Sequence, residues 1–228
     1  MVFLHDTINN LKKISMLKLQ TPVTDAPCKV GISYDDKIMM LGSCFTDNIG
    51  GQLAELGFDV MVNPFGTLYN PISILNSVNR LVSGELFDAE DCVQIGAGDE
   101  RWCSFCHHTS YACPTPEEFL AFANSELLKA REFFMKCNKI IITLGTSWCF
   151  RHLETGVIVS NCLKHVPQEF MRYRLSVNEV ADALRKITGM WNGLVECVPK
   201  QFIFTVSPIR HFKDGAHGNQ VSKSTLLL

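Results

Sequence analysis

The sequence contains no apolar run that approaches the roughly 20 residues needed to cross a membrane. Its formal net charge is only -2, so neither sign of charge is strong enough to favour nucleic acid or an anionic membrane surface as a partner. Lys12 and Lys13 are not followed by a long apolar run, which makes the N-terminus a poor secretion signal. We therefore expect a cytoplasmic protein that binds neither nucleic acid nor membrane.

Internal repeats and low-complexity segments are also missing. Hydrophobic residues make up 46% of the chain and charged residues 19%, which is typical of a folded globular protein. A chain of 228 residues can build a core without disulfides, and its ten cysteines are scattered through apolar runs. We therefore expect buried free thiols in a reducing cytosol. The polar residues 1–15 are expected to form an N-terminal extension to a single domain over residues 16–228.

The stretch from Lys37 to Gly57 predicts a buried strand that turns sharply into a helix. Apolar residues recur on one face of the predicted helix, at Ile49, Leu53 and Leu56. The hydroxyl of Ser43 would lie at the carboxyl end of the strand and at the helix N-terminus, where α/β sheets bind ligands and negative charge is favoured. We interpret Ser43 as a candidate nucleophile. The alternatives are a turn or capping serine and a reactive thiol at Cys44.

Two more apolar runs end in small polar turns. Lys139 to Leu144 ends at Gly145-Thr146, and Gln201 to Val206 ends at Ser207-Pro208. Both runs are expected to be strands buried on two faces. Helical patterns alternate with the strands and begin at Asn70-Pro71, Thr115-Pro116 and Ser176. This order predicts an α/β fold with a doubly wound, mainly parallel sheet and one crevice at its carboxyl edge.

A group of thiols and imidazoles falls in an irregular stretch between two predicted helices. The group consists of Cys103, Cys106, His107, His108 and Cys113. Cys103 to His107 matches the Cys-x-x-Cys-His pattern of haem attachment, and the residue types and spacing would also suit zinc. Haem attachment requires export, for which no signal is visible. We therefore expect no metal and no cofactor, and the coincidence of these residues in a cysteine-rich chain is the preferred interpretation.

Six motifs follow one another along the chain. They are TPV (21–23), LGSCFTDNIG (41–50), NPFGTLYNP (63–71), TLGTSW (143–148), SPIRH (207–211) and NQVSK (219–223). With these motifs the chain resembles the GSCFA family, whose name comes from the sequence found here at Gly42 to Phe45. The family is similar to the SGNH (GDSL-like) hydrolases, which are α/β/α esterases and acyl hydrolases. The resemblance therefore implies a three-layer α/β/α sandwich.

The resemblance also implies roles for individual residues. Ser43 falls on the nucleophile serine, and its own N–H would be one oxyanion donor. Gly66 falls where a second backbone N–H is supplied, and Thr146 falls where relatives usually have an asparagine side chain as the third donor. A threonine hydroxyl can donate one hydrogen bond there with a shorter reach. The residues expected to line a substrate pocket are Asn63, His107 and His108.

The proton acceptor is the part of the resemblance that the chain matches least. SGNH hydrolases take it from an Asp-x-x-His pair near the C-terminus, and family members usually continue well past the NQVSK motif. Asp214 and His217 have the spacing but come too early, in a glycine-rich stretch expected to be a loop. We therefore expect a domain truncated at its C-terminus. His211, after the Ser207-Pro208 turn, is a substitute base, a substrate ligand or a hydrogen-bonded loop histidine; Leu163 stands where histidine is expected.

These observations predict a serine hydrolase, either an esterase or an acyltransferase. It would act on an O-acyl ester of a sugar or small metabolite, with Ser43 as the nucleophile. Two alternatives remain open. One is a non-catalytic ligand-binding domain of the same fold, and the other is a Cys/His metal-binding protein. The sequence does not indicate an oligomeric state.

Overall fold

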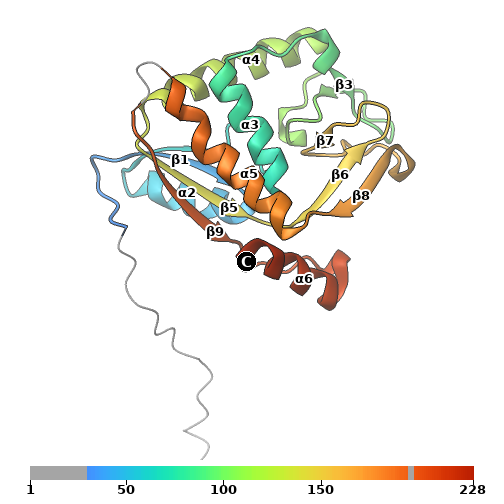
Figure 1. Cartoon of the computed structure of the whole chain (residues 1–228). Helices are drawn as coiled ribbons and strands as arrows, with labels where there is room; N and C mark the ends of the chain where they lie inside the picture. Colours follow the sequence, from blue (N-terminus) through green and yellow to red (C-terminus); the bar gives the residue numbers. More distant parts are fainter. Residues whose placement is uncertain (1–29, 195–197) are drawn as a thin grey trace, which may run out of the picture. The chain divides into compact units, whose positions relative to one another are not determined.

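The computed structural model describes residues 30–194 and 198–228, and one compact unit spans Ser33–Leu228 (Figure 1). The extension predicted for residues 1–15 and its boundary to the domain lie outside the described residues. Seven cysteines of the described residues, Cys44, Cys92, Cys103, Cys106, Cys113, Cys149 and Cys162, are free thiols. None of the described helices combines the length and apolar character needed to cross a bilayer.

Four parallel strands form the central sheet, in the order β2-β1-β5-β9. The strands are β1 (Lys37–Gly42), β2 (Asp59–Val62), β5 (Lys139–Leu144) and β9 (Gln201–Val206). In the pairing of β1 with β5, Gly42 lies opposite Thr143. The chain leaves β1 for β2 on one side and later enters β5 on the other. The carboxyl ends of β1 and β5 are therefore the switch point of the sheet, where open α/β sheets place their ligands.

Five α-helices are described. They are α2 (Cys44–Glu55), α3 (Pro71–Ser83), α4 (Pro116–Lys136), α5 (Val177–Gly189) and α6 (Gly215–Leu227). Met39 and Leu41 of β1 belong to a large hydrophobic cluster with residues of α3, α4 and α5. The alternate residues Ile38 and Met40 belong to a smaller cluster, against which α2 packs. The predicted mixed α/β fold with a mainly parallel sheet is confirmed.

The ends of the helices follow local sequence signals. Asn70 Oδ1 accepts the N–H of Ser73 at 2.9 Å and caps α3, which ends at Gly84 with φ 70°. Ser176 and Glu179 form a reciprocal capping box at the start of α5. These short-range bonds explain why the helix positions could be predicted from sequence.

Two small antiparallel sheets accompany the central sheet. The larger has the order β7-β6-β8 and consists of β6 (Trp148–His152), β7 (Ile158–Val159) and β8 (Phe170–Arg174). The smaller pairs β3 (Val93–Gln94) with β4 (Trp102–Cys103). Short 3-10 helices are η1 (Ala89–Asp91), η2 (Thr109–Tyr111), η3 (Pro167–Glu169), η4 (Met190–Gly193) and η5 (Phe212–Asp214). β6 and β7 form an antiparallel pair in which Phe150 lies opposite Val159, and β8 was not predicted.

Three local predictions were wrong. β9 was expected to be buried on both faces, but it is an outer strand of the described sheet and Phe204 is 37% exposed. Leu56 is exposed because it caps α2 beyond its last turn instead of continuing the apolar face. Asp214 and His217 do not lie in a glycine-rich loop, because Asp214 is the N-cap of α6 and His217 lies in its first turn.

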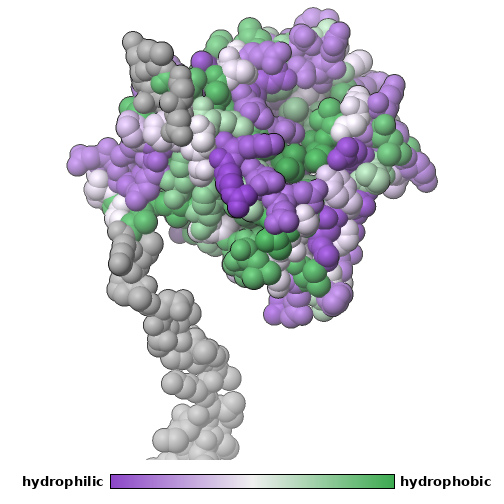
Figure 2. All heavy atoms as spheres, in the orientation of Figure 1, coloured by the Kyte–Doolittle hydropathy of each residue, from purple (hydrophilic) through white to green (hydrophobic). Residues whose placement is uncertain are grey.

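An apolar patch marks the end of α6 on the molecular surface. Figure 2 shows it as a green area where the chain ends in Figure 1. Leu227 is 72% exposed there and Leu228 is 89% exposed, whereas the neighbouring Leu226 is buried in the large cluster.

Candidate functional site

The turn between β1 and α2 requires glycine at position 42. Gly42 has φ 141°, and a Cβ atom placed there would lie 2.2 Å from the carbonyl oxygen of Thr143 on β5. The backbone N–H of Ser43 donates to the same oxygen at 3.1 Å. Glycine therefore allows β5 to approach the turn closely enough to bond to the residue that follows it.

Asn63, which was predicted to line a pocket, anchors this turn instead. Its Oδ1 accepts the N–H of Gly42 at 2.8 Å, and its Nδ2 donates to Asp47 Oδ1 at 2.5 Å. Asn63 itself has φ 43°, a left-handed conformation that asparagine tolerates better than most residues. The side chain thus connects the end of β1 to the first turn of α2.

The hydroxyl of Ser43 is buried and unpaired. Ser43 is 1% exposed, and its Oγ has no hydrogen-bond partner among the described residues. Ser43 lies beside Gly145, where an added Cβ atom would be 3.4 Å from Ser43 Cβ and 3.0 Å from the ring of Tyr69. Buried hydroxyl groups without a partner are uncommon in folded proteins, and such a group calls for an explanation.

The other two predicted oxyanion donors are engaged in internal hydrogen bonds. The N–H of Gly66 donates to the Asn63 carbonyl at 2.7 Å, and φ 78° at Gly66 fits the turn. Thr146 Oγ1 lies 3.0 Å from Ser222 Oγ and accepts the N–H of Trp148 at 3.1 Å. The structure therefore does not bring these donors to a common free position, and their role in catalysis stays a prediction.

His107 lies inside the hydrophobic core. Its ring packs among four aromatic side chains, those of Phe65, Phe87, Tyr111 and Phe119. Its Nδ1 lies 2.7 Å from the hydroxyl of Ser104, and burial lowers the pKa of His107 to about 3. The side chain is therefore a neutral part of the core.

His108 also has a structural position. It caps η2, accepting the N–H of Ser110 at 3.2 Å, and packs on Gly66, where a Cβ atom would lie 2.4 Å from His108 Cβ. Neither His108 nor His107 is part of the cavity wall described below. Within residues 30–194 and 198–228, no three His, Cys, Asp or Glu side chains are grouped closely enough to hold a metal ion.

A cavity of about 770 Å³ opens beside the switch point. Its walls come from one face of the β7-β6-β8 sheet, the segment between β9 and α6, and the residues that follow β2 and β5. Its lining residues are Tyr69, Asn70, Thr146, Trp148, Phe150, Val159, Ser160, Asn161, Cys162, Arg172, Arg210, His211, Lys213 and Asp214. Gly145 lies between the cavity and Ser43, because a Cβ atom placed on it would be 3.0 Å from Tyr69 in the cavity wall and 3.4 Å from Ser43 Cβ.

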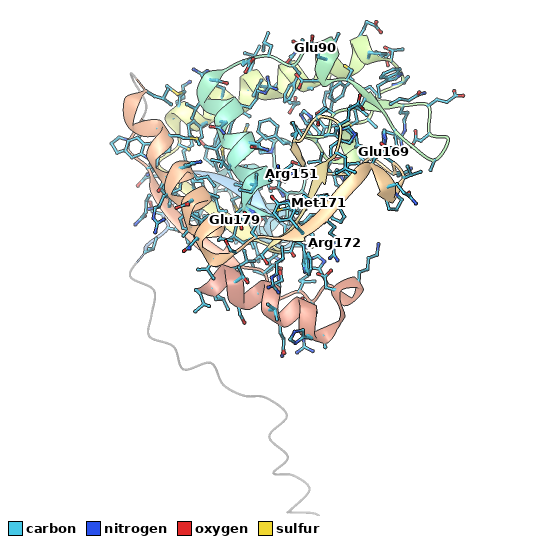
Figure 3. All side chains as sticks on the ribbon, turned by 45° about the vertical axis from the view of Figure 1, so that its right-hand side comes forward. Glu90, Arg151, Glu169, Met171, Arg172 and Glu179 are labelled. Carbon is cyan, nitrogen blue, oxygen red and sulfur yellow. The ribbon has the colours of Figure 1, made fainter. Side chains whose placement is uncertain are left out.

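Arg172 is held in the cavity wall by two kinds of contact. Its guanidinium lies 4.1 Å from the ring centroid of Trp148 and 5.7 Å from that of Phe150, both on β6. It also forms an ion pair with Asp214 at the start of α6. Figure 3 shows Arg172 between β8 and α6. Asp214 therefore pairs with Arg172 and not with His217.

His211 is the one predicted catalytic histidine that lines the cavity. Its backbone N–H donates to Asn219 Oδ1 at 3.0 Å, and its ring packs edge-on against Tyr69 with centroids 5.8 Å apart. Burial, assisted by Lys223 and opposed by Asp214, lowers the pKa of His211, so the ring is neutral at pH 7. No hydrogen bond joins it to the Ser43 hydroxyl among the described residues.

Lys223 was not predicted as a site residue. Its Nζ donates to the carbonyl of Gly145 at 2.5 Å, and burial lowers its pKa while the nearby Cys44 opposes the shift. The preceding Ser222 accepts the N–H of Ser147 at 2.8 Å. Both residues belong to the NQVSK motif, and this motif was the sequence signal that could have identified them. Only the packing of α6 shows that the motif holds the turn after β5.

The fold and these contacts define a mixed α/β protein with a parallel sheet, a buried serine at the switch point and an adjoining polar cavity. The model of the GSCFA family matches residues 37–228, and the chain therefore belongs to the GSCFA family. Searches of curated proteins and of solved structures found no match.

Proposed function

We propose that this GSCFA-family protein is a serine hydrolase or acyltransferase with an SGNH-like three-layer α/β/α fold. Its substrate would be an O-acyl ester of a sugar or small metabolite, without nucleic acid or membrane as a partner, in the cytoplasm. The observation that carries the proposal is the buried Ser43 hydroxyl, which lies at the switch point of the sheet and has no partner within residues 30–194 and 198–228.

The proposed reaction begins with attack of Ser43 Oγ on the ester carbonyl. A bond forms between Oγ and the carbonyl carbon, and the bond to the alcohol oxygen breaks. His211, which is neutral at pH 7, accepts the serine proton and returns it to the departing alcohol. Water or an acceptor hydroxyl then releases the acyl group from the serine.

The negative oxygen formed during attack requires hydrogen-bond donors. In this proposal they are the N–H groups of Ser43 and Gly66 and the hydroxyl of Thr146. Because these groups now bond to Thr143, Asn63 and Ser222, substrate binding must rearrange the turns that carry them. Each donor of this kind contributes about 2.7–4 kcal/mol of transition-state stabilisation in a serine protease. The free-energy cost of rearranging the turns must be smaller than this gain.

A fluorophosphonate probe and a short-chain nitrophenyl ester test the proposal. We expect the folded protein to be labelled and to hydrolyse the ester, and we expect Ser43→Ala to abolish both activities. Cys44→Ser is the matched control, because Cys44 is the neighbouring residue and the alternative nucleophile. Activity that survives Ser43→Ala, or is lost only in Cys44→Ser, would overturn the assignment of the nucleophile.

A second function is favoured by a specific observation. Because the Ser43 and Gly66 N–H groups and the Thr146 hydroxyl are all engaged, the present geometry also supports a non-catalytic domain that binds a ligand in the cavity. A folded protein that binds ligand but is never labelled by the fluorophosphonate would favour this alternative.

A further inference from the structure

Positive charge dominates the wall of the cavity. Its cationic side chains are those of Arg172, Arg210 and Lys213, and its carboxylate is that of Asp214. The carboxylate is already paired with Arg172. Arg210 and Lys213 are exposed and form no ion pair with another described residue. The cavity therefore has two cations whose charge is not compensated by the protein.

Arg172 is oriented to contact a ligand. A guanidinium group has five N–H donors in a planar fork, and one nitrogen of Arg172 donates to Asp214 Oδ1. The group lies 4.1 Å from the ring centroid of Trp148 on β6, and 39% of the side chain remains exposed. The remaining N–H groups are thus presented in the planar geometry that suits a carboxylate or phosphate.

The uncharged part of the wall also supplies donors. The indole N–H of Trp148 is buried and has no acceptor among the described residues. Asn161 Oδ1 accepts the N–H of Leu163 at 2.8 Å, so its amide N–H groups are the part of that side chain left for a ligand. A buried donor without an acceptor calls for an explanation, and a ligand oxygen that reaches the indole N–H would supply one.

We infer that this cavity binds the acidic group of the substrate, a carboxylate or a phosphate. The inference rests on the proposed hydrolase function and narrows its substrate class to acylated acidic sugars or similar anionic esters. The excess of cations over carboxylates and the donor-rich wall carry it. A neutral sugar ester would leave the cations without a counter-charge and would use only part of the wall.

Calorimetric titration of the folded full chain with glucuronate, glucose 6-phosphate and glucose tests the inference. We expect at least one of the two anions to bind and glucose to bind at least about tenfold more weakly, with an affinity for the anion that falls as salt is added. The double variant Arg210→Gln with Lys213→Gln should weaken anion binding about tenfold or more. Lys186→Gln is the matched control, because Lys186 is an exposed lysine on α5 outside the cavity.

The outcomes separate this inference from the proposed function. Preference for glucuronate supports a carboxylate substrate, and preference for glucose 6-phosphate supports a phosphate. Equal binding of glucose, or unchanged anion binding in the double variant, overturns the inference. Fluorophosphonate labelling without anion binding overturns only the acidic-substrate inference, whereas anion binding without labelling overturns only the hydrolase proposal.

Discussion

Asn63 Oδ1 accepts the backbone N–H of Gly42 at 2.8 Å across 21 residues of sequence. This bond satisfies a buried donor at the end of β1 and links it to the turn that follows β2. The same asparagine reaches Asp47 in α2. One side chain therefore sets the relative position of two strand ends and the helix that begins after Ser43.

Replacement of this asparagine is expected to destabilise the protein. Asn63→Ala leaves the Gly42 N–H without its acceptor, which costs about 1–3 kcal/mol, and alanine is also less suited to the left-handed backbone at this position. Urea denaturation followed by circular dichroism measures the loss. The exposed Asn48 on α2 provides the control, and Asn48→Ala should change the free energy of unfolding by less than about 0.5 kcal/mol. Equal effects of the two changes would contradict an anchoring role.

Ser43→Ala should separate catalysis from stability. Because the Ser43 hydroxyl is buried and has no partner in the described part of the chain, its removal breaks no hydrogen bond there and leaves no group unsatisfied. We expect the free energy of unfolding to stay within about 0.5 kcal/mol of the wild type or to rise, while ester hydrolysis is lost. A clear loss of stability would show that the hydroxyl has a structural partner.

The attachment of α6 to the turn after β5 can be tested with two serines of the same helix. Ser222 is buried, accepts the N–H of Ser147 at 2.8 Å and lies 3.1 Å from the Ser147 hydroxyl. Ser222→Ala should therefore destabilise the protein by about 1–3 kcal/mol. Ser224 is exposed, and Ser224→Ala should have little effect or stabilise the helix slightly. Thermal denaturation of the two variants distinguishes these expectations.

Two glycines near the site should respond to alanine in opposite directions. At Gly42 a Cβ atom would lie 2.2 Å from the Thr143 carbonyl oxygen, so Gly42→Ala must push β1 and β5 apart or prevent folding. Gly51 in α2 has no atom within 4 Å of the corresponding position. Gly51→Ala should raise the free energy of unfolding by about 0.5–1 kcal/mol because alanine favours the helix. Soluble, fully stable Gly42→Ala protein would contradict the close strand contact.

The buried His107 should make stability depend on acidity. Its pKa is about 3 in the folded protein, because of burial, and near 6.5 when unfolded. As the pH falls below 6.5, the unfolded chain binds a proton that the folded chain excludes, so stability decreases by about 1.4 kcal/mol per pH unit until the folded pKa is reached. Between pH 7 and pH 5 the wild type should lose about 2 kcal/mol more than His107→Phe. An equal loss of unfolding free energy between pH 7 and pH 5 in the two proteins would contradict this.

Local signals allowed much of the fold to be predicted. The β-branched run of β5, the Asn70 cap and the capping box at Ser176 each act over a few residues, and each was confirmed. β8 escaped prediction because its neighbour β6 lies about twenty residues earlier, and a pairing over that distance depends on tertiary contacts. The exposure of β9 depends on its place at the outside of the described sheet, which its apolar sequence does not reveal.

The candidate site also has parts that the sequence predicted and parts that it did not. The Gly42-Ser43 turn was predicted correctly because the strand, the glycine and the helix are contiguous in sequence. The positions of Asn63 and His107 could not be predicted, because the residue type alone does not show whether a polar side chain lies in a turn or in the core. The charged wall formed by Arg172, Arg210 and Lys213 was not predicted. Arg172 lies on β8 and the other two precede α6, and only folding brings these segments together.

The amino-acid sequence by itself determined three strands of the central sheet, the starts of α3, α4 and α5, the family and the glycine–serine bend after β1, because these depend on short-range periodicity, capping, ordered motifs and backbone freedom. Only the tertiary structure decided that the Ser43 hydroxyl meets no partner among the residues described, that Asn63 and Ser222 serve as anchors, and that cations gather beside the switch point. Those properties arise from contacts between distant segments, and their energies depend on which partners folding brings within hydrogen-bonding distance.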